Sequence, residues 1–454
     1  MKNRLHQISF GFLFLRSFVK RYYLYVLLGL FLGFSVFWVW VNFNSVFFKQ
    51  TPSEKVGYVG NFTENTLPTE IETKISYGLF ELDKNKVPKK ALVEEYKIKD
   101  GGKTYWFKIK EGLKWQDGTD FKTEDIRYDF KDVEKKVIND YELEYRLKEP
   151  YGPFLTLLAS PLFKNKRLVG LGKYEVVEIN KSGSFINELI IQRYNIEKGR
   201  KGKVIDRIEY RFYPQEDTMV TGFKLGEINE ARGLTNVYGL DSWPNIEVEE
   251  NVDFNSWVGI FFNQRRSILA EKDFRQALFY AIESFKFSEP KVYSPISSEN
   301  WAYTKNIKSY SYSPADSQRL LEKLDEGKIG KEKITLIAVK PYDKYLEDVA
   351  QSWEKMGINV KTYRSSVIPG NFDALITAFK VPDDPDQYYF WHSTSRGNFI
   401  NFNSPRIDKI LEDGRLEYRT KQRKEIYSDF QKYFMEEAPV SLLYYPVSFT
   451  LKRV

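Results

Sequence analysis

The stretch KTYWFKIKEGLKWQDGTDFKTEDIRY, residues Lys103–Tyr128, decides how the fold of this chain is assigned. Residues 105–110 alternate between an apolar face and a more polar face, which is the period-two pattern of a β-strand. Asp117-Gly118 is a turn dipeptide, because Gly accepts a positive φ and Asp can bond its own backbone. Thr123 can cap a helix that has two acidic residues in its first turn. The stretch therefore predicts a strand, a tight turn and a helix with an acidic start.

The same region carries a more specific order of residues: Asp100-Gly101-Gly102, Thr104–Phe107, Lys110–Trp115, Asp117-Gly118-Thr119 and Thr123–Ile126. This order resembles the signature of the family 5 extracellular solute-binding proteins, the peptide-binding components of ABC importers. The chain departs from that pattern at Tyr96, where the family usually has Trp, and at Lys122-Thr123, where an Ala is often found.

Later segments resemble the same family: Asn263, Arg275–Leu278 with Ala281–Glu283, the acidic turn at residues 381–386, and Ser404–Pro439. The resemblance extends from about Val56 to Val447. It implies an α/β, two-lobed periplasmic-binding-protein-like fold of the class II (cluster C) type. One N-terminal transmembrane helix is expected to precede this fold, because an apolar run lies near the N-terminus.

The resemblance also implies the domain boundaries. Lobe 1 is expected at 56–252, with a reduced extra subdomain around 83–160, because only residues 131–140 stand where relatives often have a longer insertion. Lobe 2 is expected at 253–440, and a return segment to lobe 1 at 441–454. Closure of the lobes is expected about hinges near 250–255 and 438–446.

Periodicity predicts further elements along the chain. Strands are expected at 141–148 and 372–379, and a helix at 216–225 that is closed by Gly226. Residues 334–363 form a strand–helix–strand pattern, which implies parallel strands joined by a right-handed crossover. The resemblance to peptide-binding proteins further predicts that the strand at 372–379 has an exposed edge, which would pair with a peptide backbone.

The N-terminal region contains an uncharged apolar run, Tyr22–Val41. About 20 residues suffice for a helix that crosses about 30 Å of hydrocarbon. Basic residues precede the run, so the N-terminus is expected in the cytoplasm. A cleaved signal peptide is the alternative, but the run is longer than a usual signal core and no small-residue cleavage box follows it. We expect a cytoplasmic basic tail at 1–21, an anchor at 22–41, a linker at 42–55 and an extracytoplasmic main domain on the cell membrane.

Composition argues against several classes of function. The chain has no Cys, which excludes disulfides, thiolate nucleophiles and thiolate metal sites. Its two histidines are His6, in the N-terminal tail, and His392. No serine-hydrolase, zinc-protease or P-loop motif occurs. We therefore expect no enzymatic activity, no cofactor and no metal site, and a secreted hydrolase is disfavoured.

The net charge of +7 is concentrated at the N-terminal end. Residues 1–55 contain seven basic side chains and one acidic side chain: Lys2, Arg4, Arg16, Lys20, Arg21, Lys49, Lys55 and Glu54. Because almost no excess is left for the remaining chain, a nucleic-acid partner is not expected.

The candidate ligand contacts are implied by the family resemblance. In peptide-binding relatives, the peptide ammonium pairs with an Asp just after the strand that corresponds to residues 372–379 here. By local alignment this Asp corresponds to Asp383, with Asp384 as the second candidate. The alternative for both residues is a solvated acidic turn. The other candidates are Ala378, Phe379, Lys380, Asn263, Trp301 and Trp391, with Tyr303 and His392 as further wall residues. Considered alone, each aromatic side chain fits packing or loop surface better than a ligand contact, and Lys380 fits an ordinary surface lysine better than a contact with a ligand carboxylate.

We therefore expect a monomeric, membrane-anchored binding protein that captures peptides between two lobes and delivers them to the permease subunits of an ABC importer. The alternatives are a ligand-sensing or cell-surface binding protein on the same scaffold, and a protein for a non-peptide solute such as a metal chelate or a sugar.

Overall fold

The computed structural model describes residues 21–25, 27–29, 31–35, 37–38, 53–164, 168–194, 206–324 and 333–454. The chain divides into two compact units, residues 1–53 with 201–207, and residues 54–200 with 208–454. In the first unit, the described residues between 21 and 38 are helical and almost all exposed. None of the helices that the structure describes is long and apolar enough to cross a membrane. The predicted tail at 1–20, the other positions of the predicted anchor and the linker up to residue 52 lie outside the described residues.

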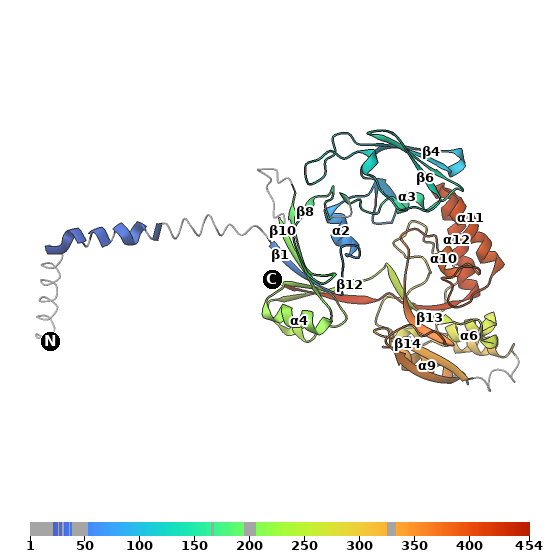
Figure 1. Cartoon of the computed structure of the whole chain (residues 1–454). Helices are drawn as coiled ribbons and strands as arrows, with labels where there is room; N and C mark the ends of the chain where they lie inside the picture. Colours follow the sequence, from blue (N-terminus) through green and yellow to red (C-terminus); the bar gives the residue numbers. More distant parts are fainter. Residues whose placement is uncertain are drawn as a thin grey trace, which may run out of the picture. The chain divides into compact units, whose positions relative to one another are not determined.

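The second unit contains a seven-stranded sheet with the order β12-β18-β11-β1-β10-β9-β8 (Figure 1). β1 and β11 are parallel, with Val56 opposite Glu230, and β18 runs antiparallel to both β11 and β12. The strands are β1 (Ser53–Val59), β8 (Tyr174–Ser182), β9 (Phe185–Arg193), β10 (Arg207–Tyr213), β11 (Glu230–Leu234), β12 (Ile246–Val252) and β18 (Val447–Arg453).

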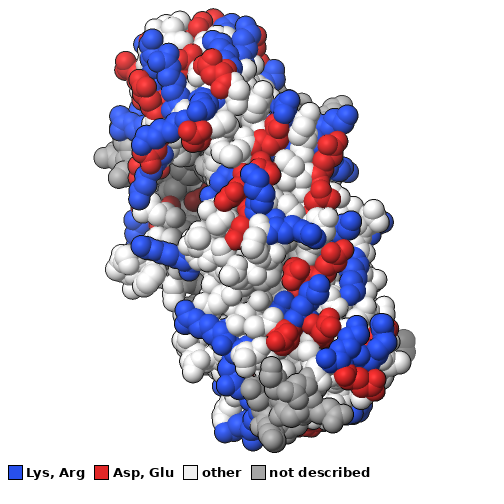
Figure 2. Space-filling view, turned by 90° about the vertical axis from the view of Figure 1, so that its right-hand side faces the viewer, with Lys and Arg blue, Asp and Glu red and all other residues white. Residues whose placement is uncertain are grey.

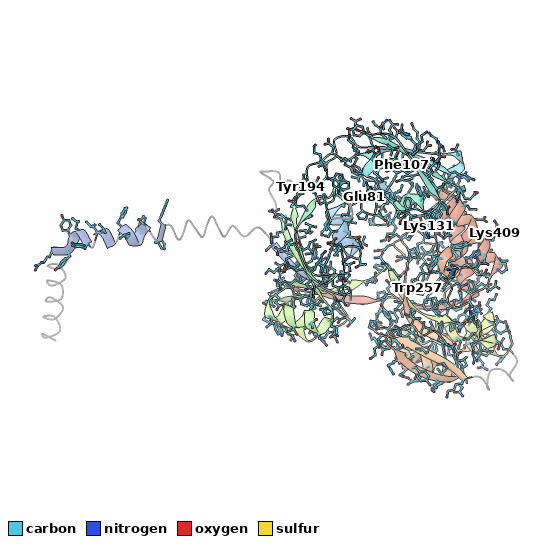
Figure 3. The ribbon with its side chains drawn as sticks, in the orientation of Figure 1. Glu81, Phe107, Lys131, Tyr194, Trp257 and Lys409 are labelled. Atoms are coloured by element: carbon cyan, nitrogen blue, oxygen red, sulfur yellow. The ribbon has the colours of Figure 1, made fainter. Side chains whose placement is uncertain are left out.

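A smaller four-stranded sheet has the order β4-β5-β7-β6 and is accompanied by a β2–β3 hairpin and the short helix α3. Its elements are β2 (Phe80–Leu82), β3 (Pro88–Lys90), β4 (Val93–Lys99), β5 (Thr104–Ile109), β6 (Val133–Asn139), β7 (Glu142–Leu147) and α3 (Phe154–Leu157). The strands predicted at 105–110 and 141–148 are β5 and β7. Their inward rings form an aromatic core, in which Phe107, labelled in Figure 3, lies 6.3 Å from Tyr145 between ring centroids.

The prediction of a helix that starts at Thr123 is wrong. Residues Thr123–Asp125 form a single 3-10 turn, and the chain then continues in extended backbone at Ile126. Asp125 Oδ2 accepts from the backbone N–H of Lys122 and caps this short turn, but the other bonds lead to the β6 region: Thr123 Oγ1 donates to the backbone oxygen of Asn139, and Lys135 Nζ donates to the carbonyls of Thr123 and Ile126. The bonds to Asn139 and Lys135 tie the turn to the four-stranded sheet, so tertiary contacts override the local helix signal.

A five-stranded sheet has the order β15-β14-β16-β13-β17. Its strands are β13 (Ser256–Phe262), β14 (Lys333–Val339), β15 (Asn359–Ser365), β16 (Ala374–Lys380) and β17 (Val440–Tyr444). The strand–helix–strand prediction at 334–363 is confirmed, because β14 and β15 pair in parallel around helix α9. β13 is antiparallel to both β16 and β17, so the sheet is mixed.

Helices cover both faces of this sheet. Neighbouring residues of β13 point to opposite faces: Phe262 packs against Trp353 of α9, and Phe261 against Trp391 of α10. Near-continuous apolar strands are expected where both faces are buried, as β13 shows. The helices of the second unit are α2 (Thr69–Ile75), α4 (Glu216–Leu225), α5 (Ser267–Ala270), α6 (Lys272–Ala281), α7 (Pro314–Leu321), α9 (Leu346–Glu354), α10 (Tyr388–Trp391), α11 (Pro405–Leu416) and α12 (Thr420–Glu437), besides α3. Helix α4 spans the predicted range and ends at Gly226, whose φ is 78°.

Two chain crossovers join the seven-stranded and five-stranded sheets. β12 ends at Val252 and β13 begins at Ser256, whereas β17 ends at Tyr444 and β18 begins at Val447. The backbone N–H of Asp253 donates to the carbonyl of Pro446 at 2.8 Å, so the crossovers are bonded to each other. Each sheet has a hydrophobic core of its own. The architecture is therefore an α/β fold with two lobes, a first lobe that also carries the four-stranded sheet and a second lobe built on the five-stranded sheet.

Candidate functional site

A cavity of about 720 Å³ lies where the two lobes face each other, and we call it the cleft cavity. Most of its lining comes from the first lobe: the segment after β1, helix α2, the start of the β2 hairpin, and α3 with the residues that follow. The second lobe contributes Asp383, three residues after β16. A predicted site residue therefore lines a cavity formed by segments far apart in sequence.

A second cavity of about 690 Å³ borders the two crossovers. Asp253, Tyr444 and Pro446 line it, but none of the predicted site residues does. We therefore take the cleft cavity as the candidate site.

Asp383 carries an exposed carboxylate that already has a cationic partner. Its Oδ1 lies 2.9 Å from Nζ of Lys86, which belongs to the turn between β2 and β3. The Asp383 side chain is 51% exposed. This ion pair bridges the lobes, and both of its members line the cleft cavity. A solute with an ammonium and a carboxylate could exchange partners with this pair.

Asp384 lies in a different environment, although it is the next residue. Two nitrogens of Arg423, on α12, donate to its two carboxylate oxygens at 2.5 and 2.9 Å. Thr156 Oγ1, on α3 of the first lobe, donates to Oδ2 at 3.1 Å. The side chains of Asp384 and Arg423 are 8% and 5% exposed. Protein groups therefore occupy most of the lone pairs of this carboxylate. The second amine candidate forms a buried ion pair within the second lobe, which Thr156 links to the first lobe.

The electrostatics of Arg423 fit a structural role. Burial by itself lowers the pKa of this guanidinium, but the Asp384 carboxylate and the Tyr427 hydroxyl together outweigh burial, so the pKa is raised above its usual value. Arg423 Nη1 also donates to the carbonyl of Gly152 in the first lobe at 3.3 Å. The ion pair therefore contributes to contacts of the second lobe with the small-sheet region.

Asp386, the third acidic residue of the turn, is also engaged. Arg415 of α11 approaches its Oδ2 with two nitrogens, at 2.9 and 3.0 Å. Burial raises the pKa of Asp386 despite the attraction of Arg415, which opposes the shift. Of the three acidic side chains in this turn, Asp383 is the one exposed to the cleft cavity.

The prediction of an exposed edge at strand 372–379 is wrong for the first half of that strand. β16 is the third of five strands, and Ala374–Ile376 pairs with β14 on one side and β13 on the other. From Thr377 to Lys380 the strand pairs with β13 alone. Ala378 is half-buried and Lys380 is exposed, whereas Phe379 is a core ring that stacks 4.7 Å from Trp257.

Three other predicted contacts lie in packed surroundings. Asn263 is buried, and its Nδ2 donates to the backbone oxygen of Phe372 at 2.8 Å. Trp391 is 1% exposed, and its indole N–H donates to Gln387. His392 is buried as well. The packing alternative describes these side chains, because their polar atoms are bonded within the second lobe.

Trp301 lies at the contact between the lobes. Its backbone N–H donates to the carbonyl of Asn85 in the β2–β3 turn at 2.9 Å. Its ring lies 5.5 Å from the guanidinium of Arg423. Trp301 and Tyr303 are half-buried, and neither is among the residues that line the cleft cavity.

Sequence reasoning missed several residues of the cleft cavity, chiefly Glu72, Tyr77 and Glu81. Glu81, labelled in Figure 3, lines the same cavity as helix α2 although it belongs to β2. Burial raises the pKa of Glu72, and burial together with the Glu81 charge raises that of Tyr77. Single acidic residues on a short helix and a hairpin carry no local signal, so only the tertiary fold could have identified them.

The family assignment follows from a comparison with known protein families. Residues 87–401 match the description "Bacterial extracellular solute-binding proteins, family 5 Middle", which is more than half of the chain. The chain belongs to this family. Its members are solute-binding proteins rather than enzymes, and the family places the main domain outside the cytoplasm.

Curated relatives agree with the family assignment. The chain is 25% identical to the oligopeptide-binding protein AppA of Bacillus subtilis over 461 residues, which is 85% of this chain and 83% of AppA. It is 21% identical to the dipeptide-binding protein of Escherichia coli K12 over 433 residues, covering 78% and 80% of the two chains.

Several solved structures have the same fold as this chain. The substrate-binding protein CtaP of Listeria monocytogenes gives a TM-score of 0.73 at 19% identity, over 88% of this chain and 94% of CtaP. AppA of Bacillus subtilis, solved with a nonapeptide, gives 0.65 at 22% identity over the same shares. NikZ of Campylobacter jejuni, solved with Ni(L-His), gives 0.71 at 18% identity over 89% and 94%.

Proposed function

We propose that this protein captures peptides in the cleft cavity and delivers them to the permease of an ABC importer. The observation that carries the proposal is the cleft cavity itself, which is lined from both lobes and contains the Asp383–Lys86 pair. A volume of about 720 Å³ lies within the roughly 300–1,000 Å³ range of small-ligand pockets. The similarity to AppA and to the dipeptide-binding protein of Escherichia coli supports a peptide as the solute.

The Asp383–Lys86 pair suits a zwitterion. The peptide ammonium would bind the Asp383 carboxylate, and a peptide carboxylate would bind the Lys86 ammonium. Exchanging one ion pair for two charge-assisted contacts leaves no charge unpaired in a closed cleft. Asp384 does not take part in this exchange, because its carboxylate already accepts hydrogen bonds from Arg423 and Thr156.

Closure of the cleft would occur about the two crossovers. We assign lobe 1 to 56–252, with the small-sheet subdomain around 83–160, lobe 2 to 253–440 and the return segment to 441–454. The short segments between β12 and β13 and between β17 and β18 serve as hinges in this proposal. A solute that contacts both lobes favours the closed arrangement through that differential contact.

The N-terminal segment is proposed to hold the protein on the outer face of the cell membrane as a monomer. Support comes from the uncharged run Tyr22–Val41 and from the basic residues that precede it. On the face of the molecule shown in Figure 2, basic and acidic residues are interspersed over most of the surface. This mixture does not favour a nucleic-acid partner.

Native mass spectrometry of the full-length protein, purified from its cells in mild detergent, tests the proposed solute. The expected result is a co-purified peptide, released on denaturation, whose synthetic copy binds again in calorimetry. A metal chelate or a sugar in place of a peptide would refute the peptide assignment and support the alternative solutes.

A further inference from the structure

The cleft cavity carries an excess of negative charge. Four carboxylates line it, those of Glu64, Glu72, Glu81 and Asp383, against one ammonium, that of Lys86. The carboxylates come from both lobes and from separate elements of the first lobe, so they surround the cavity rather than form one acidic turn.

Two of these carboxylates are neutralised by protein cations. Glu64 pairs with Lys181 of β8, and Asp383 pairs with Lys86. For Glu72 and Glu81, the described part of the chain provides no side-chain ion pair or hydrogen bond. The cross-strand neighbour of Glu81 is Lys89, whose ammonium lies 3.4 Å from Asp83 instead.

Glu72 is the more constrained of the two free carboxylates. It lies on α2, and it is half-buried at the cavity wall. Burial raises its pKa, and no neighbouring charge contributes to that shift. An ionised carboxylate that has lost hydration without gaining a partner is electrostatically destabilised, and a cation bound beside it would reduce this unfavourable free energy.

We propose that the cleft selects solutes that carry at least two positive charges, namely peptides with a free amino terminus and a lysine or arginine side chain. This inference rests on the proposed peptide-binding function. One cation binds Asp383, and the second lies between Glu72 and Glu81. Peptides with an additional acidic side chain are rejected, because they add negative charge to a cavity that already carries an excess of it.

Calorimetry on the full-length protein in mild detergent tests the selection with three tripeptides of equal length, Ala-Lys-Ala, Ala-Gln-Ala and Ala-Glu-Ala. We expect the lysine peptide to bind about tenfold or more tightly than the glutamine peptide, and the glutamate peptide to bind most weakly. In Glu72→Gln the preference for lysine over glutamine should shrink at least about threefold. The matched control is Glu247→Gln, an exposed glutamate on β12 outside the cavity, which should keep the wild-type ratio.

The outcomes separate this inference from the proposed function. Equal affinity for the three peptides overturns charge selection while peptide binding stands. An unchanged lysine preference in a Glu72→Gln protein with wild-type melting temperature overturns the role of Glu72. Binding of the diamine 1,4-diaminobutane without binding of any peptide overturns the peptide function and supports selection for a dication. Failure of all four compounds to bind overturns both.

Discussion

The neighbours Asp383 and Asp384 should respond in opposite ways to the same change, Asp→Asn. In Asp384→Asn the amide cannot neutralise Arg423, which keeps its charge in surroundings where its side chain is 5% exposed. Removing one partner of a buried ion pair typically costs about 3–5 kcal/mol of folding free energy. In Asp383→Asn the lost partner is Lys86, and the aspartate is half exposed, so the cost should stay below about 1 kcal/mol.

Urea unfolding of the full-length protein in mild detergent, followed by tryptophan fluorescence, measures the difference. Several buried tryptophans, among them Trp257 and Trp391, report on the second lobe. We expect the unfolding midpoint of Asp384→Asn to fall clearly below that of wild type, and that of Asp383→Asn to stay close to it. Equal midpoints for the two variants would refute the reasoning from burial.

Peptide affinity should show the reverse order. Asp383→Asn leaves a bound ammonium without its carboxylate partner, at a cost of roughly 2–5 kcal/mol, or about 30-fold to several thousand-fold in affinity. Asp384→Asn should change affinity much less in the fraction that remains folded, because its carboxylate faces Arg423 and Thr156. If Asp383→Asn binds a free-amine peptide as tightly as wild type, the amine contact lies elsewhere.

Three further predictions concern the cleft and the N-terminal segment. Affinity for a lysine peptide should rise with pH through the raised pKa of Glu72 and then level off, because the cation binds the ionised form; calorimetry across pH should find a flatter profile in Glu72→Gln. Lys86→Met should lower the affinity for peptides with a free carboxyl terminus by about tenfold and the affinity for amidated peptides much less, as measured by calorimetry. Equal losses for both kinds of peptide would exclude a contact between Lys86 and the peptide carboxylate. Without residues 1–50 the protein should leave the detergent phase in phase partitioning, whereas the full chain stays in it; detergent partitioning of both would refute the anchor.

Much of the fold was predictable because it depends on local patterns. The alternation at 105–110 became β5, and the helix at 216–225 formed as predicted with Gly226 at its end. The helix expected at Thr123 did not form, because Thr123 Oγ1 bonds to the backbone of Asn139 and Asp125 Oδ2 also accepts from the Trp115 indole, both outside the turn. A capping motif indicates the structure that a segment favours in isolation. Here, side-chain hydrogen bonds to the adjacent sheet stabilise a short turn instead of a helix.

The candidate site was predictable only in part. The acidic turn after β16 was found from the sequence, but it holds three aspartates, Asp383, Asp384 and Asp386, whose local sequence surroundings are alike. The fold separates them: Asp384 faces Arg423, Asp386 faces Arg415, and Asp383 faces the cleft cavity. The family resemblance placed Asp383 before Asp384, but the local sequence gives no physical reason for that order, because each role depends on which residue from a distant helix or hairpin lies opposite.

The sequence by itself determined the family, most of the strands and helices, and the acidic turn, since these depend on short-range periodicity and on motifs along the chain; the helix predicted at Thr123 is an exception. The tertiary structure alone decided the burial of Asp384, the central position of β16, and the convergence of Glu72 and Glu81 with Asp383 on one cavity. Burial and charge pairing arise between residues that are tens to hundreds of positions apart. Their strength depends on distances and on exclusion of water, which no local pattern encodes.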